Sequence, residues 1–338
     1  MIMNSQIEVW EDYSLTRIPV PMAPPLRYVN SYVLHGEEGV TIIDPGPHTQ
    51  EGGAAWEAIR RELKLAPQDI CSIVITHHHP DHYGLAGYLQ QWSGAPVYMS
   101  HRAHEETQRM WGPDSTMNMA LPELYKAHGM PSEWIRQLPA HMESFITQVS
   151  PSAEVTYIHE GDELIMGGQG WRAIESAGHA PGHLSFYDVR RGLMLCGDAV
   201  LPQISPNVSL MPGSDPQPLE SFINSLRKLG KYEVAQAFPG HRRPFTHFTE
   251  RTVMLIRHHE ERLETVQAML AKQPMSGFAV CSALFGTELG IHQMRFAMSE
   301  ALAHLIELVR RELAVQIPGD RVRDDSYGAS ETYLFAKK

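Results

Sequence analysis

Cysteine is scarce in this sequence, and the few cysteines present do not build a disulfide framework. The 338 residues include only Cys71, Cys196 and Cys281, which lie far apart in the chain. An odd number at such spacing indicates neither a thiolate metal site nor a set of structural disulfides. We therefore expect a reducing, cytoplasmic environment, and we interpret Cys196, inside an apolar run, as a small core residue rather than a nucleophile.

Basic residues are also few relative to acidic ones. There are 28 Lys and Arg against 39 Asp and Glu, which gives a formal net charge of -11. This balance disfavours a broad electrostatic surface for nucleic acid or for an anionic membrane. The partner we expect is a small-molecule substrate. No apolar run has the length of a membrane-spanning helix, and the first residues lack the basic and then apolar segments of a signal peptide.

A chain of this length can form one large domain and one smaller domain. Up to about residue 250, β-rich and helical patterns alternate, which predicts layers of helix packed on sheet. The first segments in chain order are a hairpin at 28–44, a helix at 52–65, a strand at 70–76, a helix at 84–92 and a strand at 95–100. From about residue 155 two hairpin patterns follow, then a helix at 218–230 and a strand at 234–240.

Residues 101–150 interrupt this alternation with helical spacing broken by prolines, and we interpret them as a helical insertion in the domain formed by residues 1–250. The insertion is rich in Met, and it also contains Trp and Tyr. These side chains either pack a helical hairpin on the sheet or wall an apolar substrate pocket, and the two roles are compatible.

Residues 251–338 form the second predicted domain, with three helices followed by a hairpin. This is the order of a small helical winged-helix-like domain. Such domains often bind DNA, but residues 250–338 contain eleven Lys and Arg against twelve Asp and Glu, so no basic surface is indicated. We expect this domain to pack against the first, to form a homodimer or to cover the active site.

Histidine is what the sequence has in excess, with 19 in all and four within six positions of VITHHHPDHYG (74–84). Alternate side chains of an extended chain point the same way. His77 and His79 can therefore reach one point, while Asp81 and His82 turn to a second and His78 points into the sheet or solvent. Imidazole and carboxylate suit zinc, iron or manganese, and no thiolate is present to bias the choice.

Three later turns offer further ligands, each directly after an apolar run and beside a glycine. AGHAPGH carries His179 and His183, CGDAV carries Asp198, and FPGH carries His241. Small residues at such turns allow the backbone to approach a metal closely. Spacing alone does not decide between His179 and His183.

Over roughly residues 25–245, including IDPG at Asp44, these motifs resemble the metallo-β-lactamase superfamily, especially its glyoxalase II and lactonase-like branch. The resemblance implies an α/β fold, an αββα sandwich of two mixed sheets flanked by helices. It implies one metal held by His77, His79 and His179, a second held by Asp81, His82 and His241, and Asp198 bridging the two. In similar His-x-x-Gly-His motifs the first histidine is the ligand. His183 and Asp44 are accordingly expected to support the ligands.

The implied cofactors are two divalent metal ions, with zinc as the first expectation and iron or manganese as alternatives. Two such cations bind a bridging water and lower its pKa from about 15.7 toward about 7. The resulting hydroxide attacks a carbonyl carbon, and Asp81 can hold the proton and later pass it to the leaving group. The sequence therefore predicts hydrolysis of a thioester, a lactone or another carboxylic ester.

Other functions stay open at this point. Some relatives with these motifs are nucleases, so a phosphodiesterase is an alternative, although net acidity counts against it. A metal-binding signalling protein of low turnover would keep the same ligands. A flavo-diiron redox protein fits less well, because that pattern has Glu where this chain has His79. A sulfur dioxygenase uses fewer metal ligands than this chain offers.

Overall fold

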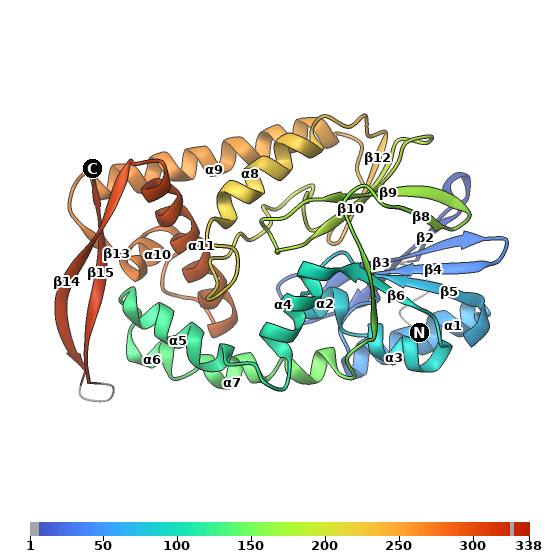
Figure 1. The fold of residues 1–338 in the computed structure, drawn as a ribbon, viewed down its shortest axis with the longest axis horizontal. Helices are drawn as coiled ribbons and strands as arrows, with labels where there is room; N and C mark the ends of the chain where they lie inside the picture. The colour runs from blue at the N-terminus through green and yellow to red at the C-terminus, as the bar shows by residue number, and fades with distance from the viewer. Residues whose placement is uncertain (1–6, 325–327) are drawn as a thin grey trace.

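The structure, a computed structural model, describes residues 7–324 and 328–338. Two mixed β-sheets lie in the right half of the view in Figure 1. The first sheet has the order β1-β2-β3-β4-β5-β6-β7, with antiparallel pairs from β1 to β4 and parallel pairs from β4 to β7. Its strands are β1 (Glu8–Trp10), β2 (Leu15–Pro21), β3 (Tyr28–Gly36), β4 (Gly39–Ile43), β5 (Ile70–Val74), β6 (Val97–Ser100) and β7 (Val155–Ile158).

The second sheet has the order β12-β11-β10-β9-β8. All its pairs are antiparallel except β11 with β12, which run parallel. Its strands are β8 (Glu163–Met166), β9 (Gln169–Glu175), β10 (Leu184–Asp188), β11 (Leu193–Gly197) and β12 (Gln236–Pro239). The parallel pair places the carboxyl ends of β11 and β12 side by side, and both CGDAV and FPGH begin there.

An apolar layer between the two sheets holds them together. Leu34 and Val74 from the first sheet share one buried cluster with Trp171, Phe186 and Phe238 from the second. The ring of Phe238 contacts Tyr32 edge to face, with ring centroids 5.6 Å apart. Burial of such large side chains, at roughly 25 cal/mol per Å² of apolar surface, is the main force that joins the sheets.

Helices cover the outer faces. On the first sheet lie α1 (Gln50–Glu62) and α3 (Ala86–Ser93), and α8 (Pro218–Leu229) lies on the side of the second sheet (Figure 1). Helix α1 begins at Thr49, whose side chain accepts a hydrogen bond from the Gly52 amide, and it buries Trp56 completely. The predicted αββα sandwich of two mixed sheets flanked by helices is confirmed.

Between the neighbouring strands β6 and β7 the chain leaves the sheet for a series of helices. They are α4 (His101–Trp111), α5 (Met117–Ala127), α6 (Ser132–Ile135), α7 (Leu138–Glu143) and the 3-10 turn η3 (Ile146–Val149). Met110, Trp111, Leu121 and Tyr125 are buried in the core cluster, so packing is one role of this segment. A cavity of about 620 Å³ also opens here, lined in part by Trp111, Met142 and Ile146.

The C-terminal region packs against both the sandwich and the insertion. It contains α9 (Phe248–Leu270), β13 (Met275–Ser276), α10 (Gly277–Phe285), α11 (Ile291–Arg310), β14 (Ala314–Asp324) and β15 (Gly328–Lys337). The three strands form a small sheet in the order β13-β15-β14, at the left of Figure 1. The Tyr125 hydroxyl of α5 donates to the Arg295 carbonyl of α11 at 2.8 Å. The tip of the predicted hairpin, at residues 325–327, lies outside the described residues.

Two features of the fold have no clear pattern in the sequence. Strands β1 and β2 add an antiparallel edge to the first sheet, although the two prolines of LTRIPVP obscured the β pattern. The short helix α2 (Pro80–Tyr83) begins directly after His79. In the described part of the chain, no helix combines the length and the apolar character needed to cross a membrane.

Candidate metal centre

The predicted ligands come together where the strands of both sheets end. His77 follows β5, His179 lies in the loop between β9 and β10, Asp198 follows β11 and His241 follows β12. Helix α2 turns the chain sharply after His79 and thereby presents Asp81 and His82 to the same space. Pro80 at the first position of α2 favours this start, because proline there loses no helical hydrogen bond.

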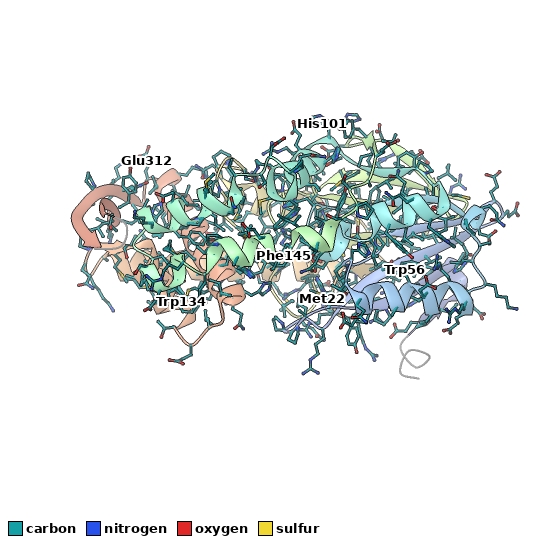
Figure 2. The ribbon with its side chains drawn as sticks, turned by 90° about the horizontal axis from the view of Figure 1, so that it is seen from below. Met22, Trp56, His101, Trp134, Phe145 and Glu312 are labelled. Atoms are coloured by element: carbon teal, nitrogen blue, oxygen red, sulfur yellow. The ribbon has the colours of Figure 1, made fainter. Side chains whose placement is uncertain are left out.

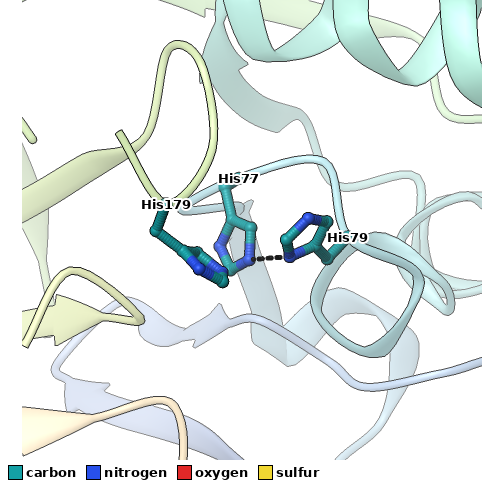
Figure 3. Close-up of side chains that lie close together, drawn as sticks. All are labelled: His77, His79 and His179. Atoms are coloured by element: carbon teal, nitrogen blue, oxygen red, sulfur yellow. Dashed lines mark hydrogen bonds between the residues drawn. The ribbon is translucent and has the colours of Figure 1, made fainter. Parts of the chain in front are cut away.

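One cluster consists of three histidines. His77, His79 and His179 each offer a ring nitrogen, and these atoms lie within 4.8 Å of one another. His77 Nε2 and His79 Nδ1 are 3.0 Å apart, as the dashed line in Figure 3 shows. The His179 ring approaches from the opposite loop, with its centroid 5.1 Å from that of His77 and 4.7 Å from that of His79.

A second cluster consists of Asp81, His82 and His241. Asp81 Oδ2 lies 3.8 Å from His82 Nε2 and 3.2 Å from His241 Nε2. The Asp81 side chain is 20% exposed, whereas that of His82 is fully buried. Asp81 therefore stands on the more open side of the centre.

Asp198 lies between the two clusters. Its Oδ2 is 3.6 Å from His179 Nε2 in the first cluster. The same oxygen is 3.6 Å from His82 Nε2 and 3.4 Å from His241 Nε2 in the second. One carboxylate thus faces ligand atoms of both clusters, which is the position that a bridging ligand requires.

Three of these histidines have one ring nitrogen held by a hydrogen bond outside the clusters, which aims the other nitrogen at the centre. His179 Nδ1 donates to the Asn207 carbonyl at 2.7 Å, and His241 Nδ1 donates to the Tyr28 carbonyl at 2.9 Å. His82 Nδ1 lies 2.8 Å from Asp44 Oδ2. Such outer contacts fix the tautomer and orientation of metal-binding imidazoles.

Asp44 supports the ligands through hydrogen bonds that engage both of its carboxylate oxygens. Its Oδ1 accepts from the Thr76 amide at 2.8 Å, and its Oδ2 accepts from the Thr76 hydroxyl at 2.7 Å. The Thr76 oxygen in turn lies 2.9 Å from His77 Nδ1. Since the hydroxyl hydrogen goes to Asp44, the Thr76 oxygen accepts from His77, which leaves the His77 Nε2 lone pair directed at the cluster.

His183 has both ring nitrogens engaged within the protein. Its Nδ1 lies 2.8 Å from Ser176 Oγ, and its Nε2 accepts from the Asp198 amide at 3.1 Å. His179, by contrast, has its Nε2 buried with no hydrogen-bond partner among the described residues. The geometry thus places His179 toward the centre and His183 beneath the loop that carries Asp198.

The donor set fits divalent cations. His82 Nε2, His179 Nε2, His241 Nε2 and Asp198 Oδ1 are all buried, and in the described structure none has a hydrogen-bond partner. Buried polar atoms normally have partners, so atoms that converge without them mark a place for a ligand. Two ligand atoms bound to one tetrahedral zinc lie roughly 3.3 Å apart. The His77 Nε2–His79 Nδ1 distance of 3.0 Å and the Asp81 Oδ2–His241 Nε2 distance of 3.2 Å are close to this separation.

The electrostatics of the two clusters differ. Burial lowers the pKa of His77 and His79 well below 6.5, and neighbouring imidazoles act in the same direction. Burial also acts to lower the pKa of His241, but Asp198 and Asp81 outweigh it and raise that pKa to about 10. The first cluster therefore offers neutral imidazoles, whereas a cation entering the second displaces a proton from His241.

Several residues that hold the ligand histidines in place have no recognisable pattern in the sequence. Asn207 and Tyr28 act through backbone carbonyls, which leave no signal in side-chain patterns. His78 was expected to point into the sheet or into solvent, and its burial excludes solvent. Its carbonyl lies 3.4 Å from the Trp111 indole nitrogen of the insertion. Burial lowers the pKa of His78 to about 3, and the positive charge of Arg109 acts in the same direction.

Gly240 is a site where one methyl group would disrupt the centre. A Cβ there would lie 2.2 Å from Asp198 Oδ1 and 2.6 Å from His82 Cε1, so both side chains would have to move. We expect Gly240→Ala to weaken metal binding by about tenfold or more, the scale on which misplaced outer contacts act. Metal titration of the apoprotein would measure this.

Gly53→Ala is the matched control, because Gly53 lies in α1 and a Cβ there has no neighbour within 4 Å. It should leave metal affinity unchanged and stabilise the helix by up to about 1 kcal/mol. A Gly240→Ala protein with the metal affinity of the wild type would show that the centre does not depend on this close approach.

Comparison with known proteins assigns the chain to a class. Residues 24–241 match the family model described as the metallo-beta-lactamase superfamily, and residues 263–323 match the model of a metallo-beta-lactamase-like C-terminal domain. The fold and the two clusters are those of a metallo-hydrolase with His and Asp metal-binding sites. The chain belongs to the metallo-beta-lactamase superfamily.

Individual relatives span most of the chain. "Probable metallo-hydrolase YqjP" of Bacillus subtilis (strain 168) is 30% identical, over 89% of this chain and 93% of that protein. A hydroxyacylglutathione hydrolase of Idiomarina loihiensis is 26% identical, over 65% of this chain and 60% of that protein. A metallo-beta-lactamase family protein from Thermus thermophilus, TTHA1429, has a TM-score of 0.82 at 31% identity, over 96% of this chain and 99% of that one.

Proposed function

We propose that this protein is a binuclear metal hydrolase that cleaves a thioester, a lactone or another carboxylic ester of a small molecule. The observation that carries the proposal is the position of Asp198, whose Oδ2 faces His179 on one side and His82 and His241 on the other. A carboxylate between two sets of imidazoles is suited to hold two cations close together.

Two divalent cations, with zinc first and iron or manganese as alternatives, would supply Lewis acidity and lower the pKa of a water molecule held between them. His77, His79 and His179 would hold one cation, and Asp81, His82 and His241 the other, with Asp198 shared. The buried side chains of this set keep bulk water away, which strengthens the interaction between ligands and cations.

Asp81 is the residue placed to move a proton. Burial opposes ionisation of Asp81, but His82 and His241 outweigh it and hold the pKa of the carboxyl below its ordinary value, so it is ionised at neutral pH. Ester hydrolysis adds a water oxygen to the carbonyl carbon, breaks the bond to the leaving group and transfers one proton. Asp81, on the open side of the centre, can take that proton and give it to the departing oxygen or sulfur.

The relatives support the choice of bond. Hydroxyacylglutathione hydrolases of several bacteria match this chain at 21–26% identity, and their name describes an acyl–thiol linkage. The Bacillus subtilis relative, which matches over 89% of this chain, is named only as a probable metallo-hydrolase. We therefore propose the class of bond, an activated carboxylic ester, rather than one compound.

Metal analysis combined with a substrate panel tests the proposal. We expect about two divalent ions per chain and turnover of thioesters or lactones that is lost on chelation and returns with added metal. Faster turnover of a phosphodiester than of any ester would replace this proposal with phosphodiester hydrolysis. Two bound ions without turnover of any of these substrates would favour a binding protein.

A further inference from the structure

Arg295 on α11 is a buried cation without a counter-ion. The residue is only 7% exposed, and among the described residues no carboxylate lies within ion-pair distance of its guanidinium. Its Nε is buried and has no hydrogen-bond partner in the described structure. By contrast, Arg310 at the end of α11 and the adjacent Arg311 both bind Glu307. Buried arginines are otherwise almost always paired, so an unpaired one indicates a place for an anion.

The side chains that lie against the Arg295 guanidinium are aromatic rings rather than carboxylates. Its guanidinium carbon lies 4.1 Å from the ring centroid of Phe296 and 5.6 Å from that of Phe145. His141 and His292 stand beside these rings, with their own centroids 5.5 Å apart. We call these five residues the Arg295 niche. Contact with aromatic faces offsets only part of the cost of burying a guanidinium.

The two histidines of the niche are neutral donors. Burial lowers the pKa of His141 to about 4, and Arg295 and His292 act in the same direction. Burial likewise lowers the pKa of His292 to about 4. A neutral imidazole carries one N–H, and His141 Nε2 is buried with no hydrogen-bond partner among the described residues.

Two series of contacts connect the niche to the metal centre. The Phe296 carbonyl lies 3.3 Å from Asn207 Nδ2, and the Asn207 carbonyl is the acceptor for His179 Nδ1. On the other side, η3 follows Phe145 directly and packs on α2, which carries Asp81. Figure 2 places Phe145 at the middle of the molecule, between the helical C-terminal part and the half that carries Trp56.

We propose that the Arg295 niche binds an anionic group, a carboxylate or a phosphate, on the substrate whose ester bond is cleaved at the metal centre. This inference rests on the proposed function and narrows it to anionic esters and thioesters. The planar guanidinium can donate two parallel hydrogen bonds to such a group, and the flanking phenylalanines keep water away from the pair. The C-terminal region thereby takes part in substrate selection.

The first experiment measures binding alone, so that it does not depend on turnover. Succinate and inorganic phosphate are titrated calorimetrically into the metal-loaded protein and into Arg295→Met. We expect at least one probe to bind about tenfold or more weakly to the variant, the discrimination expected when a buried donor pair is lost. Binding of a probe at the metals is common to both proteins and does not create this difference. If succinate shows the difference in affinity, the niche prefers a carboxylate; if inorganic phosphate shows it, the niche prefers a phosphate.

Two further variants control this experiment. Arg257→Met removes a cation from α9 whose side chain is 79% exposed and paired with Glu261, and it should bind both probes as the wild type does. Arg295→Lys keeps the charge but loses the planar pair of donors. Its affinity for the probes should fall between that of the wild type and that of Arg295→Met. The Tyr125 hydrogen bond goes to the backbone of residue 295, so it survives each substitution. Equal affinity of wild type and Arg295→Met for both probes would overturn the proposal.

The second experiment measures selection during hydrolysis. Succinyl and butyryl thioesters of N-acetylcysteamine differ by one carboxylate and share an uncharged thiol. If carboxylate is the favoured probe, the wild type should prefer the succinyl compound in kcat/KM, and Arg295→Met should lose that preference by about tenfold or more. If no form cleaves either ester while the binding difference persists, the hydrolase assignment fails and the anion site stands.

Discussion

Asp198→Asn is expected to lose both metal ions and about a thousandfold or more in hydrolytic rate. The variant keeps the size of the side chain but removes the negative charge that faces His179, His82 and His241 at 3.4–3.6 Å. A shared ligand contributes to both cations, and metal catalysis of this kind is worth several kcal/mol, with each 1.36 kcal/mol equal to a factor of ten. Metal content by mass spectrometry and steady-state kinetics measure the two effects together.

Asp162→Asn provides the comparison. Asp162 lies in the turn before β8, half exposed, and accepts a hydrogen bond from the His159 amide. The Asp162→Asn variant should keep both metal ions and full hydrolytic activity. If Asp198→Asn retains one tightly bound ion and loses the other, Asp198 belongs to one cluster and does not bridge. If it retains both, the carboxylate is not a ligand.

His179→Ala is expected to lose the metal of the first cluster and most of the activity, whereas His183→Ala should retain more of both. Only His179 directs an unpartnered, buried nitrogen toward His77 and His79. His183 instead accepts from the Asp198 amide, so its removal loosens a ligand loop without deleting a ligand. Loss of such a supporting contact reduces metal affinity or activity by about 10- to 100-fold.

Competition with a chromophoric chelator gives the two affinities on one scale. His183→Gln tests the same role with a side chain that can still accept a hydrogen bond, and it should recover part of the loss seen in His183→Ala. A His183→Ala protein with less metal than His179→Ala would reverse the assignment. The two histidines would then exchange roles, although the fold would be unchanged.

Much of the sandwich could be predicted because its elements carry strong local patterns. The continuous apolar run before His77 predicts a buried strand, and β5 covers residues 70–74. The helix expected at 218–230 is α8, and the strand expected at 234–240 contains β12. Strand β2 was missed because its two prolines are typical of turns, and only its pairing with β3 along seven residues makes it a strand.

From the sequence alone, the histidines and aspartates at strand ends predict a metal site, since ligand type and strand-end position are local properties. Their resemblance to the motifs of the metallo-β-lactamase superfamily implies the two-metal ligand set. The tertiary structure decided the rest. It distinguished the positions of His179 and His183 and supplied the Tyr28 carbonyl to His241 from 213 positions away. It also buried Arg295 without a counter-ion. These contacts join distant segments through packing and backbone groups, which no local pattern of side chains encodes.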